Sequence, residues 1–547
     1  MATTPVVIRS QAGIKRDGTR FEGDYYVDGQ WVRFQRGLPR KMGGYTAISR
    51  FLSEISRGLK TYTENSYTYF HSGSAGFIER FLIDPFGSTS LVINRTPSTL
   101  QVSDDNIWQF DVVYDSTNIP PDNTLVAQVA PNANCLCNTL GGQLFIGNLT
   151  GAAPLTEITG FPAGANVSGG VCVLHPYLTY FGSDGVIGWS VAGDPTDLTG
   201  SGSGTARVAA QKIVRGLPLR GGPGNAPAGL YWSADAVIRA SFVGGAQIFQ
   251  FDTISSNSSI LSAASAIEYD GQYFWCGTDR FLVFNGVVRE IPNNLNINYF
   301  FDGLNRAQAQ RVFAFKIPRF GEIWWCYPRG DAIECSHAVI YNIKENTWYD
   351  TELPNGGRSA GEFSPVYAAP ILTGVQQSDF APQNRITETG DLRITEDDNQ
   401  RIIEAEEGFL VWQHEKGVNE INGQFITAVP SFFETADMSF LVGGNPQSKW
   451  IRVEMVEPDF VQSENMTVQL TGRANAKAGE VAGPERTIYA NPSDPYEQVV
   501  WFKEERRELR FRFTSNTING DYQMGQIIAH VEPADGNVLG AVAGGST

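Results

Sequence analysis

The chain has few of the features that would place it in a membrane or in an oxidising compartment. Its 547 residues contain no run of the roughly eighteen apolar residues that a membrane helix requires. The N-terminal stretch MATTPVVIRSQAGIKRDGTR lacks the apolar core of a signal peptide. Only six cysteines are present, and four of them lie in apolar segments where a small buried thiol is the usual occupant. These absences predict a soluble chain without membrane insertion, made in a reducing cytoplasm and free of a disulfide framework.

Motifs of catalysis and of metal binding are also missing. The five histidines are scattered, and no two of them have the short spacing typical of a metal or catalytic pair. The Gly-rich stretch 200–208 lacks the Gly-Lys-Ser/Thr ending of a phosphate loop, and Gly188-Trp189-Ser190 lacks the spacing of a nucleophile elbow. We therefore expect no cofactor, no metal and no enzymatic activity. One exception stays open, because any fold that pairs two of the many carboxylates could hydrolyse a glycan.

What the sequence does contain is a large number of short β-prone segments. Segments such as LFIGN, YLTYFG, YFWCGT and EIWWCY are rich in β-branched and aromatic residues and are bounded by Gly, Asp and Asn. The 58 glycines and 28 prolines indicate many turns. No long stretch has helical apolar periodicity. The sequence therefore predicts an all-β protein.

A loose repeat divides residues 46–375. Apolar-aromatic strands that end in a small residue recur along this stretch, and five of them are spaced by 36, 50, 43 and 50 residues when marked at Phe145, Phe181, Tyr231, Phe274 and Trp324. This spacing is close to the roughly 40–50 residues of a four-stranded propeller blade. The segment GQYFWCGTDRFLVFNGVVREI has the two apolar runs and the tight turn of a β-meander. We expect a β-propeller, with six blades favoured and seven possible.

The blade pattern stops after residue 375, where an octapeptide repeat begins. Arg-Ile-Thr/Ile-Glu recurs at Arg385, Arg393 and Arg401, and residues 385–408 hold three Arg against eight Asp/Glu. Four β-prone residues followed by four turn residues predict a short β insertion, spanning 376–424, that joins the propeller to the next domain. Strands resume over 425–535 and predict a β-sandwich, and residues 536–547 are small and polar enough to form a flexible tail.

The N-terminal residues 1–45 stand apart in charge. The whole chain has a net charge of −17, but residues 1–41 hold eight Lys/Arg against four Asp/Glu. A basic patch is expected at Arg33, Arg36, Arg40 and Lys41. It is either a solvated strand edge or a docking site for an acidic partner ring or DNA phosphate. The acidic remainder argues against a protein that grips nucleic acid, since tight binding needs clustered Lys and Arg.

An ordered series of segments between residues 20 and 355 resembles the tail nozzle proteins of short-tailed bacteriophages, also called packaged-DNA stabilisation proteins. The segments are QWVRFQRGLPRKMGGY, GWSVAGDPTD, GLYWSADAVIRASFVGG, AIEYDGQYFWCGTDRFLVFNG, NYFFDGLN and EIWWCYPRGDAIECSHAVIYNIKENTWYD. The likeness rests on their order, and the C-terminal third is matched only in being rich in β-strands.

The resemblance implies a structural virion protein without catalysis. It implies a homohexameric ring at the end of the phage tail, below the adaptor and portal ring and in contact with tail fibre, spike or needle proteins. It also implies a central channel that retains packaged DNA and later releases it. An acidic channel suits that role, because negative walls repel phosphates and allow DNA to slide without sequence-specific binding. The arginines of the basic patch and of the octapeptide repeat are the interface candidates.

Two other functions remain open at this point. The first is a glycan-binding or glycan-degrading tail propeller that recognises the host surface, which requires carboxylates or arginines converging on a pocket. The second is an intracellular kelch-type scaffold, which predicts regular blade signatures that this chain lacks.

Overall fold

Antiparallel β-strands make up almost all of the structure, as the sequence predicts. The computed structural model describes residues 3–19, 24–48, 52–84, 86, 88–130, 141–219, 226–245, 247–376, 383–384, 402–403, 408–423, 425–439, 441–442, 445–446, 450–475 and 477–534. Within these residues the one α-helix, α1 (Ile297–Gly303), is seven residues long, and no helix has the length and apolarity to span a membrane. Short 3-10 turns occur at η1 (Ser183–Gly185), η3 (Ala263–Ser265) and η4 (Arg306–Arg311).

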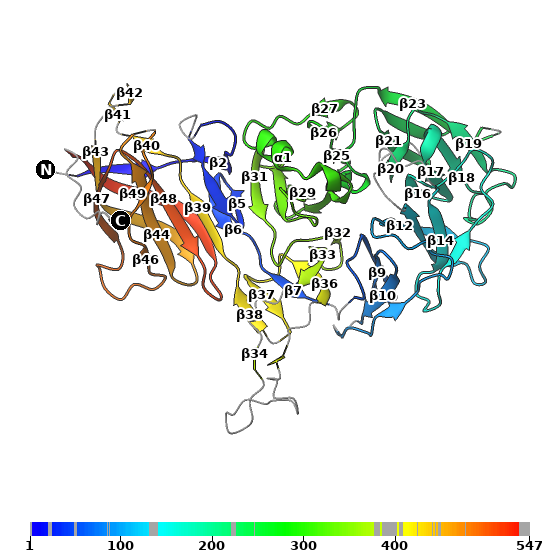
Figure 1. Cartoon of the computed structure of the whole chain (residues 1–547), viewed down its shortest axis with the longest axis horizontal. Coiled ribbons are helices and arrows are strands. Elements are labelled where there is room, and N and C mark those ends of the chain that lie inside the picture. The colour runs from blue at the N-terminus through cyan, green and yellow to red at the C-terminus, as the bar shows by residue number, and fades with distance from the viewer. Residues whose placement is uncertain are drawn as a thin grey trace, which may run out of the picture.

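Seven sheets of the described residues form a ring around a central axis, on the right of Figure 1. The propeller fold is thus confirmed, with one blade more than the six that the spacing favours. The first three blades are β8 (Gly58–Glu64), β9 (Tyr67–Gly73), β10 (Ile78–Ile83), β11 (Ile93–Asn94); β12 (Ile107–Asp115), β13 (Asp122–Ala130), β14 (Gln143–Asn148), β15 (Thr156–Ile158); and β16 (Gly170–Leu174), β17 (Tyr177–Phe181), β18 (Val186–Trp189), β19 (Gly204–Arg207).

The next three blades have the same four-stranded, antiparallel meander. They are β20 (Ile213–Pro218), β21 (Ala228–Ser233), β22 (Val237–Phe242), β23 (Phe249–Ser255); β24 (Ile267–Tyr269), β25 (Gln272–Cys276), β26 (Phe281–Phe284), β27 (Val288–Glu290); and β28 (Phe313–Ile317), β29 (Glu322–Tyr327), β30 (His337–Asn342), β31 (Thr347–Glu352). The meander predicted in residues 271–291 is β25–β26–β27.

Each blade is buried on both faces because it packs between two neighbours. Strand β29 shows how the sequence produces this: all six of its residues are buried. Side chains of a strand alternate between the two faces. Trp324 therefore enters the cluster shared with the seventh blade, whereas Trp325 enters the cluster shared with the fifth. The near-continuous apolar runs in the sequence are the consequence of this two-sided burial.

The seventh blade is built from both ends of the chain. Its sheet has the order β32 (Ala360–Ser364), β33 (Ala369–Gln376), β36 (Gly408–His414), β7 (Tyr45–Ala47), β37 (Asn419–Asn422) and β38 (Phe425–Ala428). Strand β7 supplies the fourth position, and β32 contacts β8 of the first blade to close the ring. The spacing of aromatic strands could not reveal this blade, because one of its strands lies more than 300 residues upstream of the others.

The C-terminal strands form the predicted β-sandwich, together with strands from the N-terminal residues. One sheet contains β47 (Val500–Arg506), β43 (Trp450–Gln462), β49 (Tyr522–Ala534), β6 (Leu38–Lys41), β5 (Val32–Gln35) and β1 (Thr4–Ile8). The other contains β4 (Asp28–Gln30), β39 (Ser431–Glu434), β48 (Glu508–Ser515), β44 (Met466–Arg473), β45 (Val481–Ala482), β40 (Met438–Ser439) and β46 (Arg486–Ile488). Residues 1–45, which stand apart in charge, thus contribute four strands to the sandwich.

Two small two-stranded sheets of the described residues lie beside the ring and the sandwich. Strand β2 (Gln11–Ile14) pairs in parallel with β3 (Tyr25–Tyr26), and β41 (Leu441–Val442) pairs with β42 (Asn445–Pro446).

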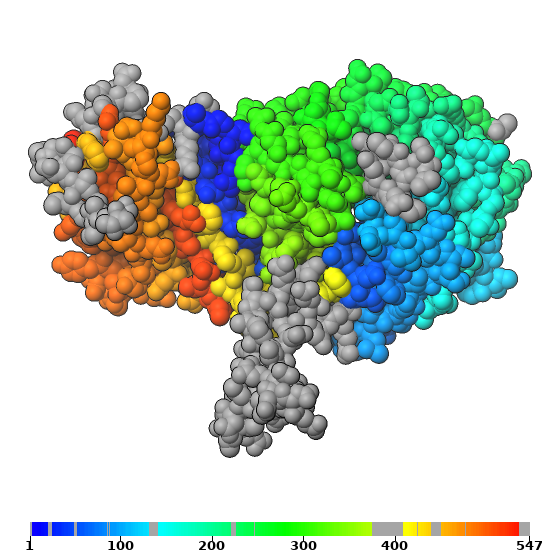
Figure 2. All heavy atoms as spheres, in the orientation of Figure 1, coloured from blue at the N-terminus to red at the C-terminus, as the bar shows by residue number. Residues whose placement is uncertain are grey.

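The propeller and the sandwich share one hydrophobic core. A single cluster of buried side chains runs from blades six and seven into the sandwich, and it includes Trp324, Trp412, Trp31, Phe433 and Ile527. Figure 2 shows the N-terminal residues, in blue, between the two parts. Trp31 is central to the joint, because its ring contacts those of Trp324 and Tyr45 at centroid distances of 6.1 and 5.9 Å.

The octapeptide repeat is inserted within the seventh blade. Strand β33 ends at Gln376 and β36 begins at Gly408, and these two residues pair directly across the sheet. Beyond them, β34 (Gln383–Asn384) pairs with β35 (Ile402–Ile403). Most of the repeat lies outside the described residues, but its two anchors lie side by side on one hairpin. It therefore interrupts a blade and does not join the propeller to the sandwich, in contrast to the expectation from the sequence.

Replacing residues 377–407 by the turn Asn-Gly is expected to leave the fold intact, because a two-residue turn of this type closes antiparallel strands at the register that Gln376 and Gly408 already have. The midpoint of urea unfolding should change by less than the equivalent of about 1 kcal/mol. As a control, Thr46→Pro in β7 removes a backbone donor inside the same sheet and should lower the midpoint clearly. Loss of cooperative unfolding in the shortened variant would show that residues 377–407 are needed to connect the propeller to the sandwich.

Candidate functional site

The ring of blades encloses a central cavity of about 720 Å³. Residues from the inner strands of six blades line it: β8, β12, β20, β24, β28 and β32. Five of the lining side chains are cationic (Arg57, Lys60, Arg215, Arg311, Lys316) and three are anionic (Asp111, Glu268, Glu362). Aromatic residues, among them Tyr62, Phe110 and Phe315, line the same cavity. This concave mixture of polar groups and rings is the main candidate for a ligand site.

The carboxylate of Glu362 connects the last blade to the first inside this cavity. Lys60 donates from Nζ to Glu362 Oε1 at 2.9 Å, and the backbone N–H of Thr61 donates to Oε2 at 2.6 Å. The carboxylate raises the pKa of Lys60, so the ammonium group stays charged at neutral pH. Glu362 therefore lies at the seam where the ring closes.

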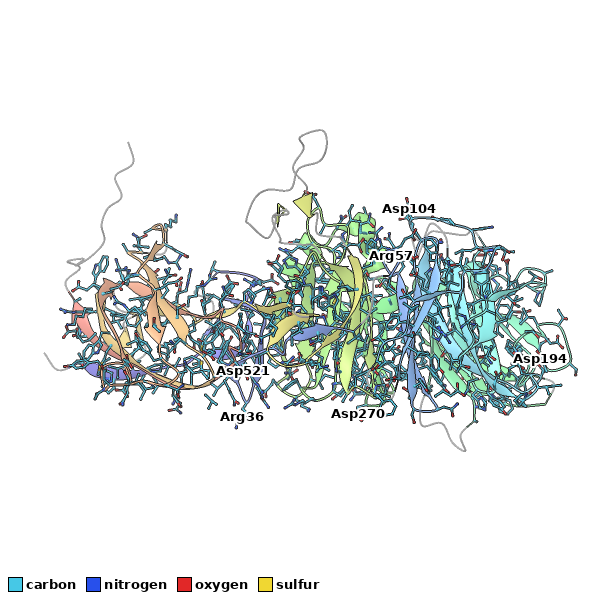
Figure 3. All side chains as sticks on the ribbon, turned by 90° about the horizontal axis from the view of Figure 1, so that it is seen from below. Arg36, Arg57, Asp104, Asp194, Asp270 and Asp521 are labelled. Atoms are coloured by element: carbon cyan, nitrogen blue, oxygen red, sulfur yellow. The ribbon has the colours of Figure 1, made fainter. Side chains whose placement is uncertain are left out.

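Three further ion pairs lie around the cavity. Lys316 donates to the Glu268 carboxylate at 3.1 Å and also to the Glu268 backbone oxygen at 2.6 Å, which links blades five and six. At the opposite end, Glu334 accepts from both Arg57 and Arg311, at 2.8 Å in each case. Figure 3 shows the propeller from the side, with Arg57 on one face and Asp270 on the other.

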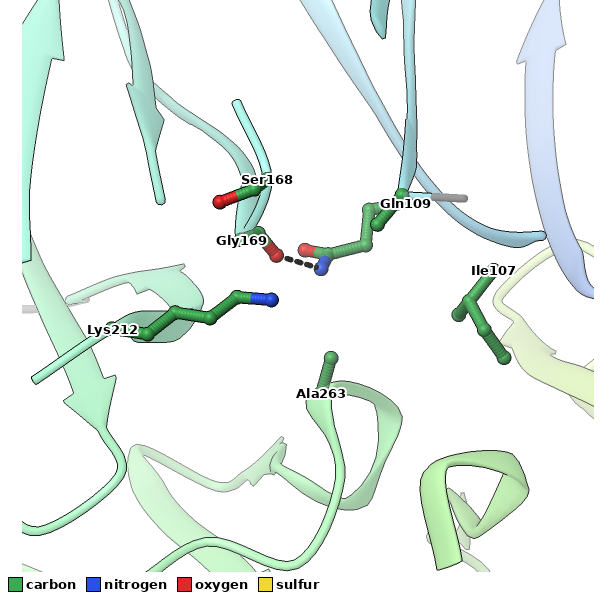
Figure 4. Close-up of a pocket in the computed structure, with 7 residues that line it drawn as sticks. Ile107, Gln109, Ser168, Gly169, Lys212 and Ala263 are labelled. Carbon is green, nitrogen blue, oxygen red and sulfur yellow. Dashed lines mark hydrogen bonds between the residues drawn. The ribbon is translucent and has the colours of Figure 1, made fainter. Parts of the chain in front are cut away.

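Gln109 separates the central cavity from a much smaller pocket of about 10 Å³. Its Oε1 accepts from Arg215 Nη1 at 3.1 Å, while its Nε2 donates to the Gly169 oxygen at 2.7 Å, the bond drawn in Figure 4. The small pocket also contains Lys212 and Ala263, which extend toward its centre in Figure 4. Burial lowers the pKa of Arg215. The guanidinium is positioned by an amide, and it lies where a polar ligand in the cavity would meet it.

The cavity can offer hydrogen bonds and aromatic surface to a ligand. Each of its three carboxylates already has a partner: Glu362 has Lys60, Glu268 has Lys316, and Asp111 accepts the backbone N–H of Val173 at 2.9 Å. Throughout the described part of the chain, no group of three or more His, Cys, Asp or Glu is arranged to hold a metal ion. The arrangement is suited to binding a polar molecule.

The basic patch expected from the sequence is divided by the fold, and its most buried member is Arg33. This side chain is 1% exposed and lies at the joint between propeller and sandwich. Its Nη1 and Nη2 donate to the two carboxylate oxygens of Glu415 at 2.6 and 2.7 Å, and Nε lies 2.9 Å from Glu322 Oε1. The guanidinium also stacks on the Phe320 ring at 3.8 Å. Arg33 therefore holds the joint together and is not available to an external partner.

Burial by itself lowers the pKa of Arg33, but the carboxylates of Glu322 and Glu415 more than reverse this, so its pKa lies above the ordinary value. Glu322 is completely buried and accepts from Trp324 Nε1 at 2.9 Å and from the Tyr349 hydroxyl at 2.7 Å. The result is a buried, charged network between residues that are distant in the chain.

The other three members of the patch have different positions. Lys41 is 2% exposed and donates to the Gly520 oxygen at 2.7 Å, and burial lowers its pKa to about 8 against the opposing effect of Asp521. Arg40 is half-buried and donates to Gln35 at 2.8 Å. Arg36 is exposed, and Figure 3 places it at the edge of the molecule. Only Arg36 and the outer part of Arg40 face solvent, so no clustered basic docking surface is formed.

The repeat arginines Arg385, Arg393 and Arg401 lie outside the described residues. The sequence analysis did not find the charged residues of the cavity, because they come one or two at a time from separate blades and share no motif. The one usable signal is the position of Lys60, Asp111 and Glu362 on strands that start a blade.

No protein-family model and no curated protein matches the chain. Among solved structures, it is similar to an exo-β-1,3-galactanase from Phanerochaete chrysosporium in complex with galactose, with 10% identity, 90% of this chain and 100% of that chain covered, and a TM-score of 0.27. It is also similar to an ancestral GH74 enzyme, with 12% identity, 71% of this chain and 51% of that chain covered, and a TM-score of 0.38. At these scores the likeness assigns neither an activity nor a residue role to this chain.

These matches nevertheless correct one expectation. The sequence led us to expect a protein without enzymatic activity, whereas the two solved structures just named are enzymes. We therefore withdraw the expectation that this protein has no enzymatic activity.

Replacing the buried arginine by Arg33→Met should destabilise the joint strongly, because it leaves the completely buried Glu322 carboxylate without its cation. We expect a loss of about 3–5 kcal/mol in the free energy of urea unfolding at neutral pH. Burial already raises the pKa of Glu322, and a group with a raised folded pKa favours the native state at low pH and loses this contribution as pH rises. Acidification should therefore restore part of the lost stability in the variant.

The matched control is Arg36→Met at the exposed turn of the same hairpin, which should cost less than about 0.5 kcal/mol. Equal losses in the two variants, or an Arg33→Met variant with the same pH profile as the parent, would contradict the assignment of Arg33 as the central cation of the joint.

Proposed function

We propose that this chain is the subunit of the tail nozzle of a short-tailed bacteriophage. Six copies form a ring around a channel that retains the packaged DNA and releases it into the host. The observation that carries the proposal is the ordered series of segments that resembles this group of proteins. The protein is made in the bacterial cytoplasm and works in the virion, between the adaptor and portal ring and the distal tail proteins.

The segments that carry the resemblance belong to the framework of the molecule. The stretch that begins at Gln30 spans β5, β6 and the start of β7, and so includes Arg33. The remaining segments form the hairpins β21–β22, β25–β26 and β29–β30, together with helix α1 and the loop after β18. A likeness that follows the joint and several consecutive blades supports a shared architecture more strongly than a likeness of surface loops.

The distribution of charge also supports the proposal. Among the described residues, eight Lys/Arg and seven Asp/Glu are buried. Burial therefore removes nearly equal numbers of positive and negative side chains from the surface. The surface therefore keeps the acidic excess of a chain whose net charge is −17. A strongly negative surface disfavours non-specific binding to DNA phosphates, which suits a channel through which DNA slides.

A ring under the pressure of packaged DNA needs subunits whose two parts do not move apart. The joint described above meets this requirement, since the propeller and the sandwich share one core and a buried ion network. Copies related by a closing rotation would contact each other through two different surfaces of the same subunit.

The proposal predicts a closed ring of six subunits in electron micrographs of the purified protein, and the same ring at the tip of the tail in virions labelled on this chain. The purified ring should bind duplex DNA weakly and without sequence preference at physiological salt, because of its acidic surface. A monomer or trimer that degrades a polysaccharide would contradict the proposal.

A second function is favoured by the central cavity, whose size and mixed polar and aromatic lining suit a polar ligand such as a glycan. In this case the propeller binds or degrades a host-surface glycan as a tail component. Arg215, positioned by Gln109 at the cavity, is the residue most suited to hydrogen-bond the ligand.

Isothermal calorimetry with purified host-surface polysaccharide tests this second function. If the cavity is the site, Arg215→Gln should weaken binding about tenfold, which corresponds to the loss of one charge-assisted hydrogen bond. The exposed Arg289 supplies the control, Arg289→Gln, which should bind as the parent does. Absence of binding and of sugar release in the parent protein would exclude the glycan function while leaving the nozzle proposal in place.

A further inference from the structure

Two buried arginines and a buried histidine lie together between the first and second blades. His71 on β9 and Arg80 on β10 are direct partners across the sheet, and Arg95 follows β11. Their exposed fractions are 0, 4 and 1%. The three side chains lie close enough that the charges of both arginines affect the titration of the imidazole.

The two arginines bind one loop of the second blade through its backbone. Arg95 donates from Nε to the Ala153 oxygen at 2.9 Å and from Nη2 to the Asn148 oxygen at 2.8 Å. Arg80 donates from Nη1 to the Thr150 oxygen. The acceptors are the last residue of β14 and two residues of the loop between β14 and β15. Carbonyl oxygens offer partial charges only, so these bonds fasten the loop without neutralising the guanidinium groups.

Several nitrogens of this group have no partner. In the described part of the chain, both ring nitrogens of His71, Nε of Arg80 and Nη1 of Arg95 are buried without any hydrogen bond. Buried donors are almost always paired, and a buried charge is costly unless a counter-charge is present. Burial lowers the pKa of Arg95 to about 10, and the neighbouring Arg80 contributes in the same direction. Burial, Arg95 and Arg80 lower the pKa of His71.

Glu79 of this blade, and Glu362, which reaches it from the seventh blade, bind other groups. Lys60 lies next to His71 in the sheet register, but its partner Glu362 reaches it from the seventh blade. Glu79 accepts from the backbone N–H and the hydroxyl of Ser53 at 2.9 and 2.6 Å. The face of blade one that packs on blade two therefore holds two arginines whose ionisable neighbours are each other, His71 and Tyr69.

We propose that a small inorganic anion of the size of chloride binds between His71, Arg80 and Arg95. The anion accepts hydrogen bonds from Arg80 Nε, from Arg95 Nη1 and from the one protonated ring nitrogen of a neutral His71, and it neutralises part of the positive charge of the two arginines. It thereby fixes the β14–β15 loop, which the same arginines bind, to the first blade. A water molecule would satisfy donors but would leave both charges uncompensated, and the enclosed position favours a monatomic ion over a bulky one.

Thermal unfolding of the full chain at constant ionic strength tests this site, with sodium bromide replacing sodium gluconate stepwise. A ligand that binds only the native state raises the unfolding midpoint with its concentration. We expect the midpoint of the parent protein to rise by several degrees with bromide, and the rise to disappear in Arg95→Met. The control Arg289→Met, which removes an exposed arginine from the fifth blade, should behave as the parent does.

Equal bromide dependence in Arg95→Met and Arg289→Met would overturn the proposal, because the effect would then be a general salt effect. If Arg95→Met does not fold, crystals of the parent grown in bromide give the answer directly. An anomalous peak within hydrogen-bonding distance of Arg95 Nη1 and His71 supports the site, whereas a water molecule or no density at that position rejects it.

Discussion

The structure depends on the need to close a ring of blades with the N-terminal end of the chain. Strand β7 completes the seventh blade, and the residues just before it belong to the sandwich. The same short segment therefore has to satisfy two domains at once. Arg33 lies in this segment and binds Glu322 of the sixth blade and Glu415 at the end of the seventh. Through this contact the closure of the propeller and the position of the sandwich are linked.

A buried ion network of this kind fixes the relative orientation of the propeller and the sandwich more than it stabilises the fold. The cost of removing charges from water offsets much of their mutual attraction, so a buried ion pair adds little to the free energy of folding when it is compared with well-packed apolar side chains. Its geometry is nevertheless demanding, since the planar guanidinium has to meet two carboxylates and the Phe320 ring together. A second ion pair, between Arg16 and Asp350 at 3.0 Å, connects the N-terminal residues to the sixth blade in the same way. The shared core supplies the stability, and these contacts fix how the two parts lie relative to each other.

Local signals were enough to predict the strand content, the blade spacing and the sandwich. The aromatic strands at Phe145, Phe181, Tyr231, Phe274 and Trp324 indeed lie in consecutive blades, and the short interval between the first two arises because Phe145 is on the third strand of its blade whereas Phe181 is on the second. The spacing left the choice between six and seven blades open, because the fourth strand of the seventh blade comes from residues 45–47, more than 300 residues before the other strands of that blade. The prediction of a basic patch was wrong for a similar reason. The burial of Arg33 depends on Glu322, which is 289 residues away in the chain. The central cavity and the cation group in blade one also arise only when distant strands meet.

The central claim is that the N-terminal segment makes the propeller and the sandwich one cooperative body. Differential scanning calorimetry of the full chain tests this most directly. The account predicts a single unfolding transition whose calorimetric and van't Hoff enthalpies agree. Two separate transitions, one for the propeller and one for the sandwich, would contradict it.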